Sequence, residues 1–315
     1  MHDECSVVSL AALGALRVRG GDALPFLQGQ LSNDVTLLAP QRSLFAGYHN
    51  AQGRVIALLR LVELARDDVL VIVPRELAGT VVQRLAKFIL RAKVKLADES
   101  TQWAISGVTA AAAPAGATAA TALTIALPAA ADGAARVDGA TAVRVPGQVA
   151  RWLLIGPAGS PPALSGREPA APELWQRLAI AAGEPEVCAV TSEEFVAQML
   201  NLDVLGAIAF DKGCYTGQEV IARAHYRGRV KRRMQRFLTA QPSQLKPGDS
   251  GVLADGRTFR VVRAVGHPDG RCEFLAVTAV TSAAGAASAD RAAEPAAAAA
   301  PVSAQRLELP YRLPD

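Results

Sequence analysis

The chain has 315 residues, of which 50% are hydrophobic and 20% are charged, and its formal net charge is +4 with a pI near 9.0. This composition is ordinary for a soluble globular protein, and the length is sufficient for two or three domains. The small positive excess is compatible with an anionic ligand, but it is too weak to indicate a nucleic-acid-binding protein.

The four cysteines, Cys5, Cys188, Cys214 and Cys272, are scattered without a C-x-x-C pair or a histidine at zinc-ligand spacing. This spacing argues against a metal site, a disulfide framework and an iron–sulfur cluster held by this chain itself. Apolar runs are interrupted well short of a membrane span, and the first residues lack the basic and apolar regions of a signal peptide. We therefore expect a cytoplasmic protein with no metal site and no membrane partner.

In the first hundred residues the pattern predicts a small sheet covered by helices. Asp22 follows a Gly-Gly turn and is the expected N-cap of a helix over residues 23–31. The expected strands, the first two joined by a turn at 50–53, are residues 44–48, 54–64 and 69–73. Apolar residues then recur at helical spacing over 76–91, which predicts an amphipathic helix. The basic cluster at its end is expected to be a solvated surface, with an anionic ligand tail as the alternative partner: Lys87, Arg91, Lys93 and Lys95.

The middle of the chain is rich in Ala, Gly and Pro and is expected to complete the same domain with long loops. Its strand-like segments are residues 123–127, 141–145 and 152–155. A helix is predicted over 172–182, begun by Pro172 and carrying Trp175 on its apolar side. Thr191 and Glu194 stand at the spacing of a capping box before a helix at 195–200. The apolar residues 206–210 then predict a strand.

After residue 228 the periodicity becomes that of β-strands, with hairpin turns at Asp255-Gly256 and Asp269-Gly270. The expected strands are residues 234–238, 251–253, 259–265 and 274–280, and they predict a small antiparallel β-barrel. The segment 282–304 is almost entirely Ala, Ser and Pro with sparse charge, which is typical of a disordered linker, with an Ala-rich helix as the alternative. The predicted domain boundaries are 1–233 for the first domain, 234–281 for the barrel, 282–305 for the linker and 306–315 for a closing strand.

The stretch between these two regions, Asp-Lys-Gly-Cys-Tyr-Thr-Gly-Gln-Glu over residues 211–219, has the most chemical character. Thr216 and Glu219 have capping-box spacing, which predicts a helix over residues 217–227 ending at Gly228. Cys214 would then lie just before the positive end of a helix dipole, two residues from Lys212. Both effects favour the thiolate form and predict a reactive sulfur. The alternative is that Cys214 is a small apolar residue buried in a tight turn.

The same stretch resembles a known family. Lys-Gly-Cys-Tyr-Thr-Gly-Gln-Glu (212–219) is similar to the K-G-C-[FY]-x-G-Q-E motif of the YgfZ-type folate-binding proteins, and Ala-Arg-Ala-x-x-Arg-Gly-x-x-Lys-Arg (222–232) continues the match. These proteins are relatives of the aminomethyltransferase of the glycine cleavage system. Further similarity lies at residues 28–35, 53–54, 175–183 and 309–311.

The resemblance implies an α+β fold, in which an aminomethyltransferase-like folate-binding domain of two lobes is followed by a C-terminal antiparallel β-barrel. It implies a tetrahydrofolate-binding factor that maintains iron–sulfur enzymes, including enzymes that modify tRNA. We expect Cys214, next to the folate, as the reactive group, with Lys212 and the helix N-terminus holding the thiolate. The residues expected to bind the folate are Trp175, Tyr215, Gly217, Gln218, Glu219, Arg223 and Arg227. The alternative for Trp175 is an ordinary core position, and the alternative for the two arginines is a solvated surface.

The sequence also departs from the family pattern. A second family tryptophan falls near Leu13, so that wall of the site is expected to be aliphatic. Two carboxylates of the transferases are absent, because Ala57 and Ala181 stand in their places. Without them neither acid–base catalysis nor a hydrogen-bond acceptor for the pterin comes from those positions.

Two alternative functions remain open on the sequence. A folate-dependent one-carbon transferase is disfavoured by the missing carboxylates. Direct RNA binding through residues 227–236 is disfavoured because the sequence displays no basic face interleaved with aromatic residues. We therefore expect no direct nucleic-acid partner.

Overall fold

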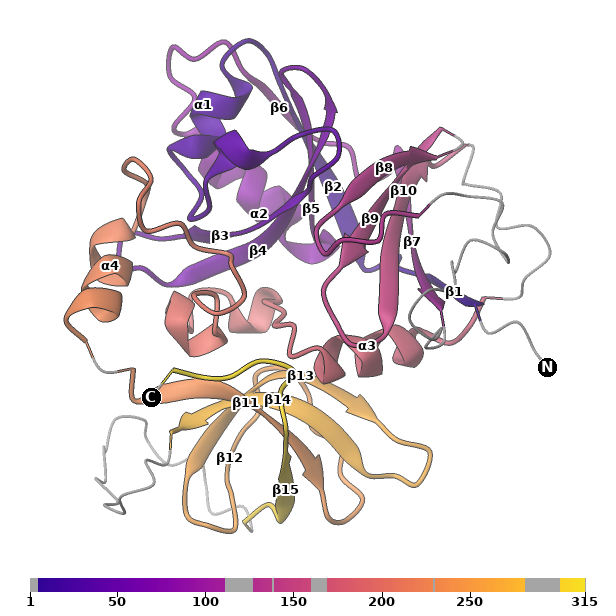
Figure 1. Cartoon of the computed structure of the whole chain (residues 1–315). Coiled ribbons are helices and arrows are strands. Elements are labelled where there is room, and N and C mark those ends of the chain that lie inside the picture. The colour runs from indigo at the N-terminus through magenta and orange to yellow at the C-terminus, as the bar shows by residue number, and fades with distance from the viewer. Residues whose placement is uncertain are drawn as a thin grey trace.

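Three five-stranded antiparallel sheets form most of the molecule and meet around a common centre, as Figure 1 shows. The computed structural model describes residues 5–110, 127–137, 139–159, 169–228, 230–280 and 301–314. Within these ranges, no helix is both long enough and apolar enough to cross a bilayer.

The first sheet has the strand order β3-β4-β5-β2-β6. Its strands are β2 (Leu13–Arg19), β3 (Leu44–His49), β4 (Val55–Ala65), β5 (Asp68–Pro74) and β6 (Lys95–Asp98). The predicted hairpin is confirmed as β3 and β4, and the unbroken apolar run of β4 is buried on both faces. Helix α1 (Ala23–Gln28) begins after Asp22 as predicted and ends three residues before the predicted end. Helix α2 (Arg75–Ala86) ends five residues before its predicted end, ahead of Leu90, which adopts a positive φ of 45°.

The second sheet has the order β1-β7-β10-β9-β8. Its strands are β1 (Cys5–Ser9), β7 (Trp103–Ala110), β8 (Ala134–Val137), β9 (Ala140–Val145) and β10 (Ala150–Pro157). Helix α3 (Pro172–Ala181) begins with a proline at its first turn, as predicted, and buries Trp175. The indole lies directly on Gly107 of β7, where any side chain would collide with the ring. Apart from its last residue, the predicted strand at 123–127 lies outside the described residues.

The third sheet has the order β12-β13-β14-β11-β15. Its strands are β11 (Arg232–Thr239), β12 (Ser250–Val252), β13 (Thr258–Gly266), β14 (Cys272–Ala279) and β15 (Ala304–Leu307). Both predicted hairpin turns are present, with Gly256 and Gly270 at positive φ. The predicted barrel is not confirmed, because in the described part of the chain the two edge strands share no ladder and only an isolated bridge joins Leu253 to Val302. Most of the predicted linker, residues 281–300, lies outside the described residues.

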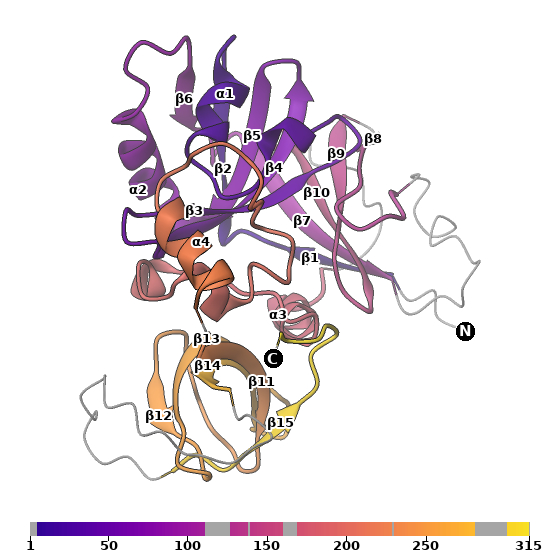
Figure 2. The same ribbon diagram turned by 60° about the vertical axis from the view of Figure 1, so that its left-hand side comes forward.

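The segment between α3 and the last sheet differs most from expectation. It contains two short 3-10 helices, η3 (Ala189–Thr191) and η4 (Ala197–Leu200), and then α4 (Gln218–Tyr226). The predicted capping box at Thr191 is wrong, because Thr191 instead caps η3 together with Cys188 and the N-cap of η4 is Val196. The predicted strand at 206–210 is also wrong, since these residues join no sheet. Figure 2 shows this segment and α3 packed between the upper sheets and the third sheet.

Candidate functional site

A cavity of about 240 Å³ lies where the three sheets meet. Its wall includes Trp175 from α3, Phe45 and Arg60 from the first sheet, Arg263 from the third, Leu13 and the carboxylate-bearing Glu184. Leu13, at the position where a family tryptophan was expected, contributes an aliphatic side chain to this wall. Because two aromatic rings and several leucines are joined by a few charged groups, the cavity has the make-up of a small-molecule site rather than of a packing defect.

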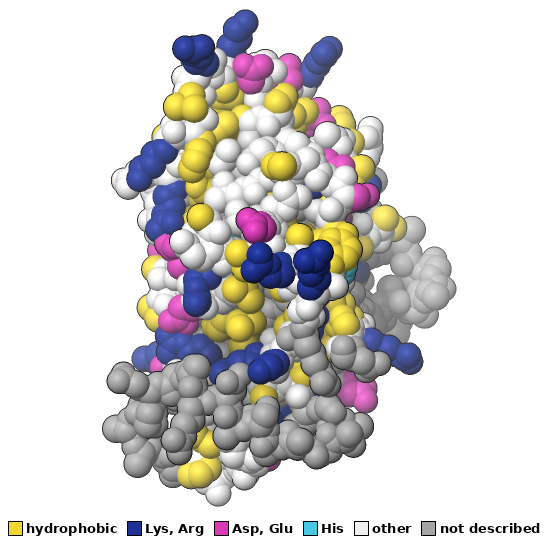
Figure 3. Space-filling view, turned by 90° about the vertical axis from the view of Figure 1, so that its left-hand side faces the viewer, with side chains coloured by type: hydrophobic (Ala, Val, Ile, Leu, Met, Phe, Trp, Pro, Cys, Tyr) yellow, Lys and Arg dark blue, Asp and Glu magenta, His cyan; other side chains and the backbone are white. Residues whose placement is uncertain are grey.

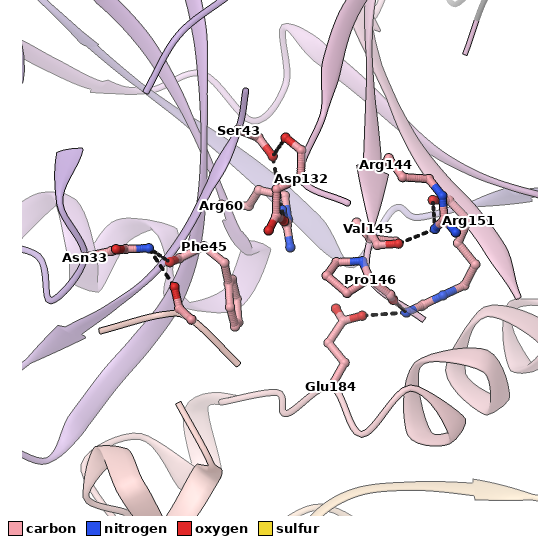
Figure 4. A network of polar contacts seen from close by, with 11 residues as sticks. Asn33, Ser43, Phe45, Arg60, Asp132, Arg144, Val145, Pro146, Arg151 and Glu184 are labelled. Carbon is pink, nitrogen blue, oxygen red and sulfur yellow. Dashed lines mark hydrogen bonds and ion pairs between the residues drawn. The ribbon is translucent and has the colours of Figure 1, made fainter. Parts of the chain in front are cut away.

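Trp175 and Glu184 are both held by Arg151 of β10, whose side chain is fully buried. The guanidinium carbon lies 4.9 Å from the centre of the Trp175 ring. Its Nη2 donates to the Glu184 carboxylate at 2.8 Å and to the Pro146 carbonyl at 2.9 Å (Figure 4). A single buried cation thus fixes both a ring face and a carboxylate of the cavity wall.

The Glu184 carboxylate is held ionised. Burial alone would raise the pKa of Glu184, but the positive charges of Arg151, Arg263 and Arg60 outweigh burial and hold that pKa below its ordinary value. The side chain is nevertheless 28% exposed, as expected for a group that borders a hollow. Glu184 therefore offers hydrogen-bond acceptors to a ligand in the cavity at neutral pH.

The two arginines of the wall have their own partners. Arg60 donates to Asp132 at 2.6 Å and to the Ser43 hydroxyl at 3.1 Å, and its guanidinium lies 5.3 Å from the Phe45 ring (Figure 4). Arg263 donates to Glu186 at 3.1 Å. Because both guanidinium groups are anchored, the polar groups of the cavity are fixed before any ligand enters.

Cys214 does not line the cavity. It is exposed, in the loop before α4. The predicted capping box at Thr216 is wrong, because the N-cap is Gly217, with φ of 84°, and no side chain caps the helix. A side chain at position 217 would lie 2.5 Å from the Asn50 carbonyl oxygen, so this close approach to the β3–β4 turn requires glycine.

Lys212 anchors this loop to the first sheet. Its Nζ donates to the carbonyl oxygens of Gln28 and Leu31 at 2.7 Å and of Asn33 at 2.8 Å, which uses all three ammonium hydrogens. Burial lowers the pKa of Lys212 to about 8, partly offset by Asp34, so the amine remains largely protonated at neutral pH. Asn33 in turn donates to the Phe45 carbonyl at 2.8 Å, which links the loop to the cavity wall (Figure 4).

Of the residues predicted to bind folate, Trp175 alone lies in the cavity wall. Tyr215 is buried beneath the loop, with its ring 5.2 Å from the Lys212 ammonium. The side chains of Glu219 and Arg223 are exposed and form an i,i+4 pair at 3.4 Å. Gln218, at the start of α4, approaches the Lys212 carbonyl at 3.5 Å, and Arg227 is the exposed C-cap of the helix.

No family model matches the chain. The sequence is 32% identical over 279 residues to the tRNA-modifying protein YgfZ of Cronobacter sakazakii (strain ATCC BAA-894), a match that spans 84% of this chain and 82% of that protein. The chain belongs to the YgfZ family. Among solved structures, the glycine cleavage system aminomethyltransferase T from Bartonella henselae matches with a TM-score of 0.66 and 15% identity, covering 87% of this chain and 78% of that one. The YgfZ-family chain therefore has the aminomethyltransferase-like fold.

Sequence reasoning missed Glu184, Arg151, Arg60 and Arg263 in this YgfZ-family chain. A signal existed for Arg60, because it is the one charge within the apolar run of β4, residues 55–62. Glu184 directly follows Gly183, three residues after Ala181. Position 181 carries no carboxylate, but the carboxylate of Glu184 reaches the cavity from just beyond the end of α3.

Proposed function

We propose that this chain binds tetrahydrofolate in the central cavity and supports the assembly or repair of iron–sulfur clusters, and thereby tRNA modification, with Cys214 as its reactive thiolate. The observation that carries the proposal is the pairing of the Trp175 ring with the ionised Glu184 carboxylate in one cavity wall. We place this activity in the cytoplasm.

The cavity suits the ring end of a reduced folate. Trp175 and Phe45 border the cavity and supply aromatic surface against which a flat heterocycle packs, and Glu184 offers acceptors to the N–H groups along the edge of an aminopyrimidinone ring. Its volume of about 240 Å³ is slightly below the roughly 300–1,000 Å³ of sites that enclose a whole drug-sized ligand. The rings would therefore occupy the cavity and the glutamate tail would extend out of it. When bound, the folate supplies a carrier for one-carbon units.

The link to iron–sulfur proteins and tRNA rests on different support. The Cronobacter relative is called a tRNA-modifying protein. Because Cys214 is exposed, its sulfur is accessible to a second protein. Lys212 and Gly217 hold the loop against the first sheet, so the sulfur is presented from a fixed backbone. The proposed clients are iron–sulfur enzymes, including those that modify tRNA.

Calorimetry tests the folate site. Tetrahydrofolate should bind the wild-type chain, and Trp175→Leu should weaken binding at least about tenfold, since aromatic stacking and its buried area are lost. The matched control is Trp152→Leu, because Trp152 is equally buried but packs in a separate cluster on the second sheet. Absence of binding by the wild-type chain at up to about 1 mM ligand would refute the folate site.

Complementation of a deletion strain tests the proposed role of the Cys214 thiolate. In a strain lacking the protein, Cys214→Ser should fail to restore the activity of iron–sulfur tRNA-modifying enzymes, while Cys188→Ser should restore it. Cys188 is a suitable control because it is half-buried and its sulfur contacts Thr191. Full rescue by Cys214→Ser would remove the sulfur from the proposal and leave the folate site standing.

A second candidate, a folate-dependent one-carbon transferase, is favoured by one observation. Glu184 restores a carboxylate to the cavity that the substitutions at Ala57 and Ala181 had appeared to remove. This candidate predicts multiple turnover with a methylene or methyl donor by the isolated chain, and that turnover should be lost in Glu184→Gln.

A further inference from the structure

Three aromatic side chains form a cluster on the surface of α4. The rings of Phe210 and His225 stack with their centres 3.8 Å apart and an interplanar angle of 18°. Tyr226 meets both edge-on, at 4.8 Å from His225 and 6.0 Å from Phe210. Unlike an ordinary core cluster, this one is open to solvent, because His225 is exposed and Tyr226 is 67% exposed.

The cluster exists because the Cys214 loop folds back along the helix. Phe210 precedes the loop and His225 lies near the C-terminal end of α4, so their contact closes the segment on itself. Sequence inspection cannot show this face, since its rings are 15 positions apart. Cys214 is exposed in the same closed segment.

Two arginines lie on the same helix as His225 and Tyr226. Arg223 and Arg227 are exposed on the same helix end, and Arg227 forms no ion pair with any residue that the structure describes. Among the described residues the Arg223 side chain pairs with Glu219 alone, at 3.4 Å, and because both side chains are exposed this pair contributes little. Further along the chain, Arg233 is buried and paired with Asp203 at 2.8 Å, so the exposed positive charge of this surface is that of Arg223 and Arg227. In the space-filling view, Lys and Arg side chains lie directly beside hydrophobic ones over α4 (Figure 3).

Exposed rings interleaved with arginines are the chemistry that binds unpaired nucleotides. Bases stack on aromatic side chains, while arginines contact the phosphates. We propose that the surface formed by Phe210, His225, Tyr226, Arg223 and Arg227 binds a single-stranded stretch of RNA and brings it beside the Cys214 loop. This site is separate from the central cavity and requires no folate.

Fluorescence anisotropy of a labelled 12-nucleotide single-stranded RNA, without folate, tests the proposal. The full chain should bind this strand more tightly than an abasic strand of the same length, since both carry the same phosphates but only one can stack. Tyr226→Ala should weaken RNA binding roughly tenfold and abolish the preference over the abasic strand. Arg227→Gln should reduce the slope of log affinity against log salt by about 0.7, the value for one lost phosphate contact on a single strand.

Two substitutions elsewhere serve as controls. Phe88→Ala removes an aromatic ring that is 46% exposed at the end of α2, and Arg66→Gln removes a side chain that is 96% exposed between β4 and β5. Both should leave RNA binding unchanged. The proposal is overturned by equal affinity for the two strands, by equal effects of Tyr226→Ala and Phe88→Ala, or by absence of binding. Displacement by an acidic peptide as readily as by RNA would also overturn it and indicate a protein partner. Folate calorimetry of Tyr226→Ala should match wild type, so the two sites can fail independently.

Discussion

Arg151→Met is the most direct perturbation of the central cavity. The substitution keeps much of the side-chain volume and removes the charge that contacts both Glu184 and Trp175. Glu184 would lose its nearest cation while Arg60 and Arg263 remain in the wall. We expect a destabilised protein with a mispositioned carboxylate.

The size of the expected loss in stability follows from the burial of the Arg151–Glu184 pair. Breaking a buried ion pair from one side costs about 3–5 kcal/mol, and the lower end applies because Glu184 is 28% exposed. Loss of the cation–π contact adds about 1 kcal/mol. Arg151 Nε and Nη1 are buried without a hydrogen-bond partner among the described residues, and removing them returns about 1–3 kcal/mol. The net expectation is a loss of about 1–3 kcal/mol at neutral pH.

Urea unfolding followed by tryptophan fluorescence measures this loss, and Glu184→Gln completes a double-mutant cycle. The double variant should be about 2 kcal/mol more stable than the sum of the single effects predicts, because no unpaired carboxylate remains. The cost of Arg151→Met should also shrink at pH 5, where an unpaired Glu184 begins to protonate. Additive effects, or a cost that is independent of pH, would show that the pair does not hold the cavity wall.

Three further predictions concern the Cys214 loop and the first sheet. Burial lowers the pKa of His49 to about 3, and neither ring nitrogen has a hydrogen-bond partner among the described residues, so the folded protein holds this imidazole neutral. Stability should therefore fall by up to about 1.4 kcal/mol per pH unit below pH 6.5, and His49→Leu should remove that slope in urea titrations. Gly217→Ala should lower the free energy of unfolding by at least about 2 kcal/mol, because position 217 has a positive φ and its added Cβ would collide with the Asn50 carbonyl. The same substitution should speed amide exchange around Cys214. The control Gly213→Ala should do neither, since open space surrounds that position. Lys212→Met should cost about 2–4 kcal/mol in thermal unfolding by leaving three carbonyls without their donor, and a cost under about 0.5 kcal/mol would contradict the anchoring role.

Local patterns were sufficient for most of the fold. The β3–β4 hairpin, the start of α3 and the turns at Asp255-Gly256 and Asp269-Gly270 are each specified by a few neighbouring residues, and all are confirmed. These sequence patterns predicted the structure correctly because hairpin turns and a proline at a helix start depend on backbone preferences, which tertiary packing does not alter here.

Long-range contacts explain the errors. Thr216 and Glu219 have the correct spacing for a capping box, but the backbone at Gly217 passes so close to Asn50 that the helix begins one residue later. The strand expected at 206–210 fails because Ala209 donates to the Ser32 carbonyl instead of joining a ladder. In both cases a partner more than 150 positions away decides the local conformation.

The residues of the candidate site likewise divide into those that the sequence predicted and those that only long-range packing brings together. Trp175 was predicted from the family resemblance and lies in the cavity, whereas Glu184 and Arg151 became visible only when α3 and β10 were brought together. Cys214 was expected beside the folate because sequence proximity of lysine, cysteine and glutamate suggests one site. The structure instead separates the exposed sulfur from the cavity wall.

This separation has a consequence for mechanism. The cavity wall is built from all three sheets and does not include Cys214, which is exposed in the loop before α4. The two regions are joined by a short path, in which Lys212 bonds to the Asn33 carbonyl and the Asn33 side chain bonds to the Phe45 carbonyl, while Phe45 borders the cavity. Because each step is a buried or half-buried hydrogen bond, a shift of Phe45 on folate binding would strain the anchor of the Cys214 loop. Amide exchange of residues 211–217 should therefore become faster when tetrahydrofolate binds, and Asn33→Ala should remove that response without abolishing binding.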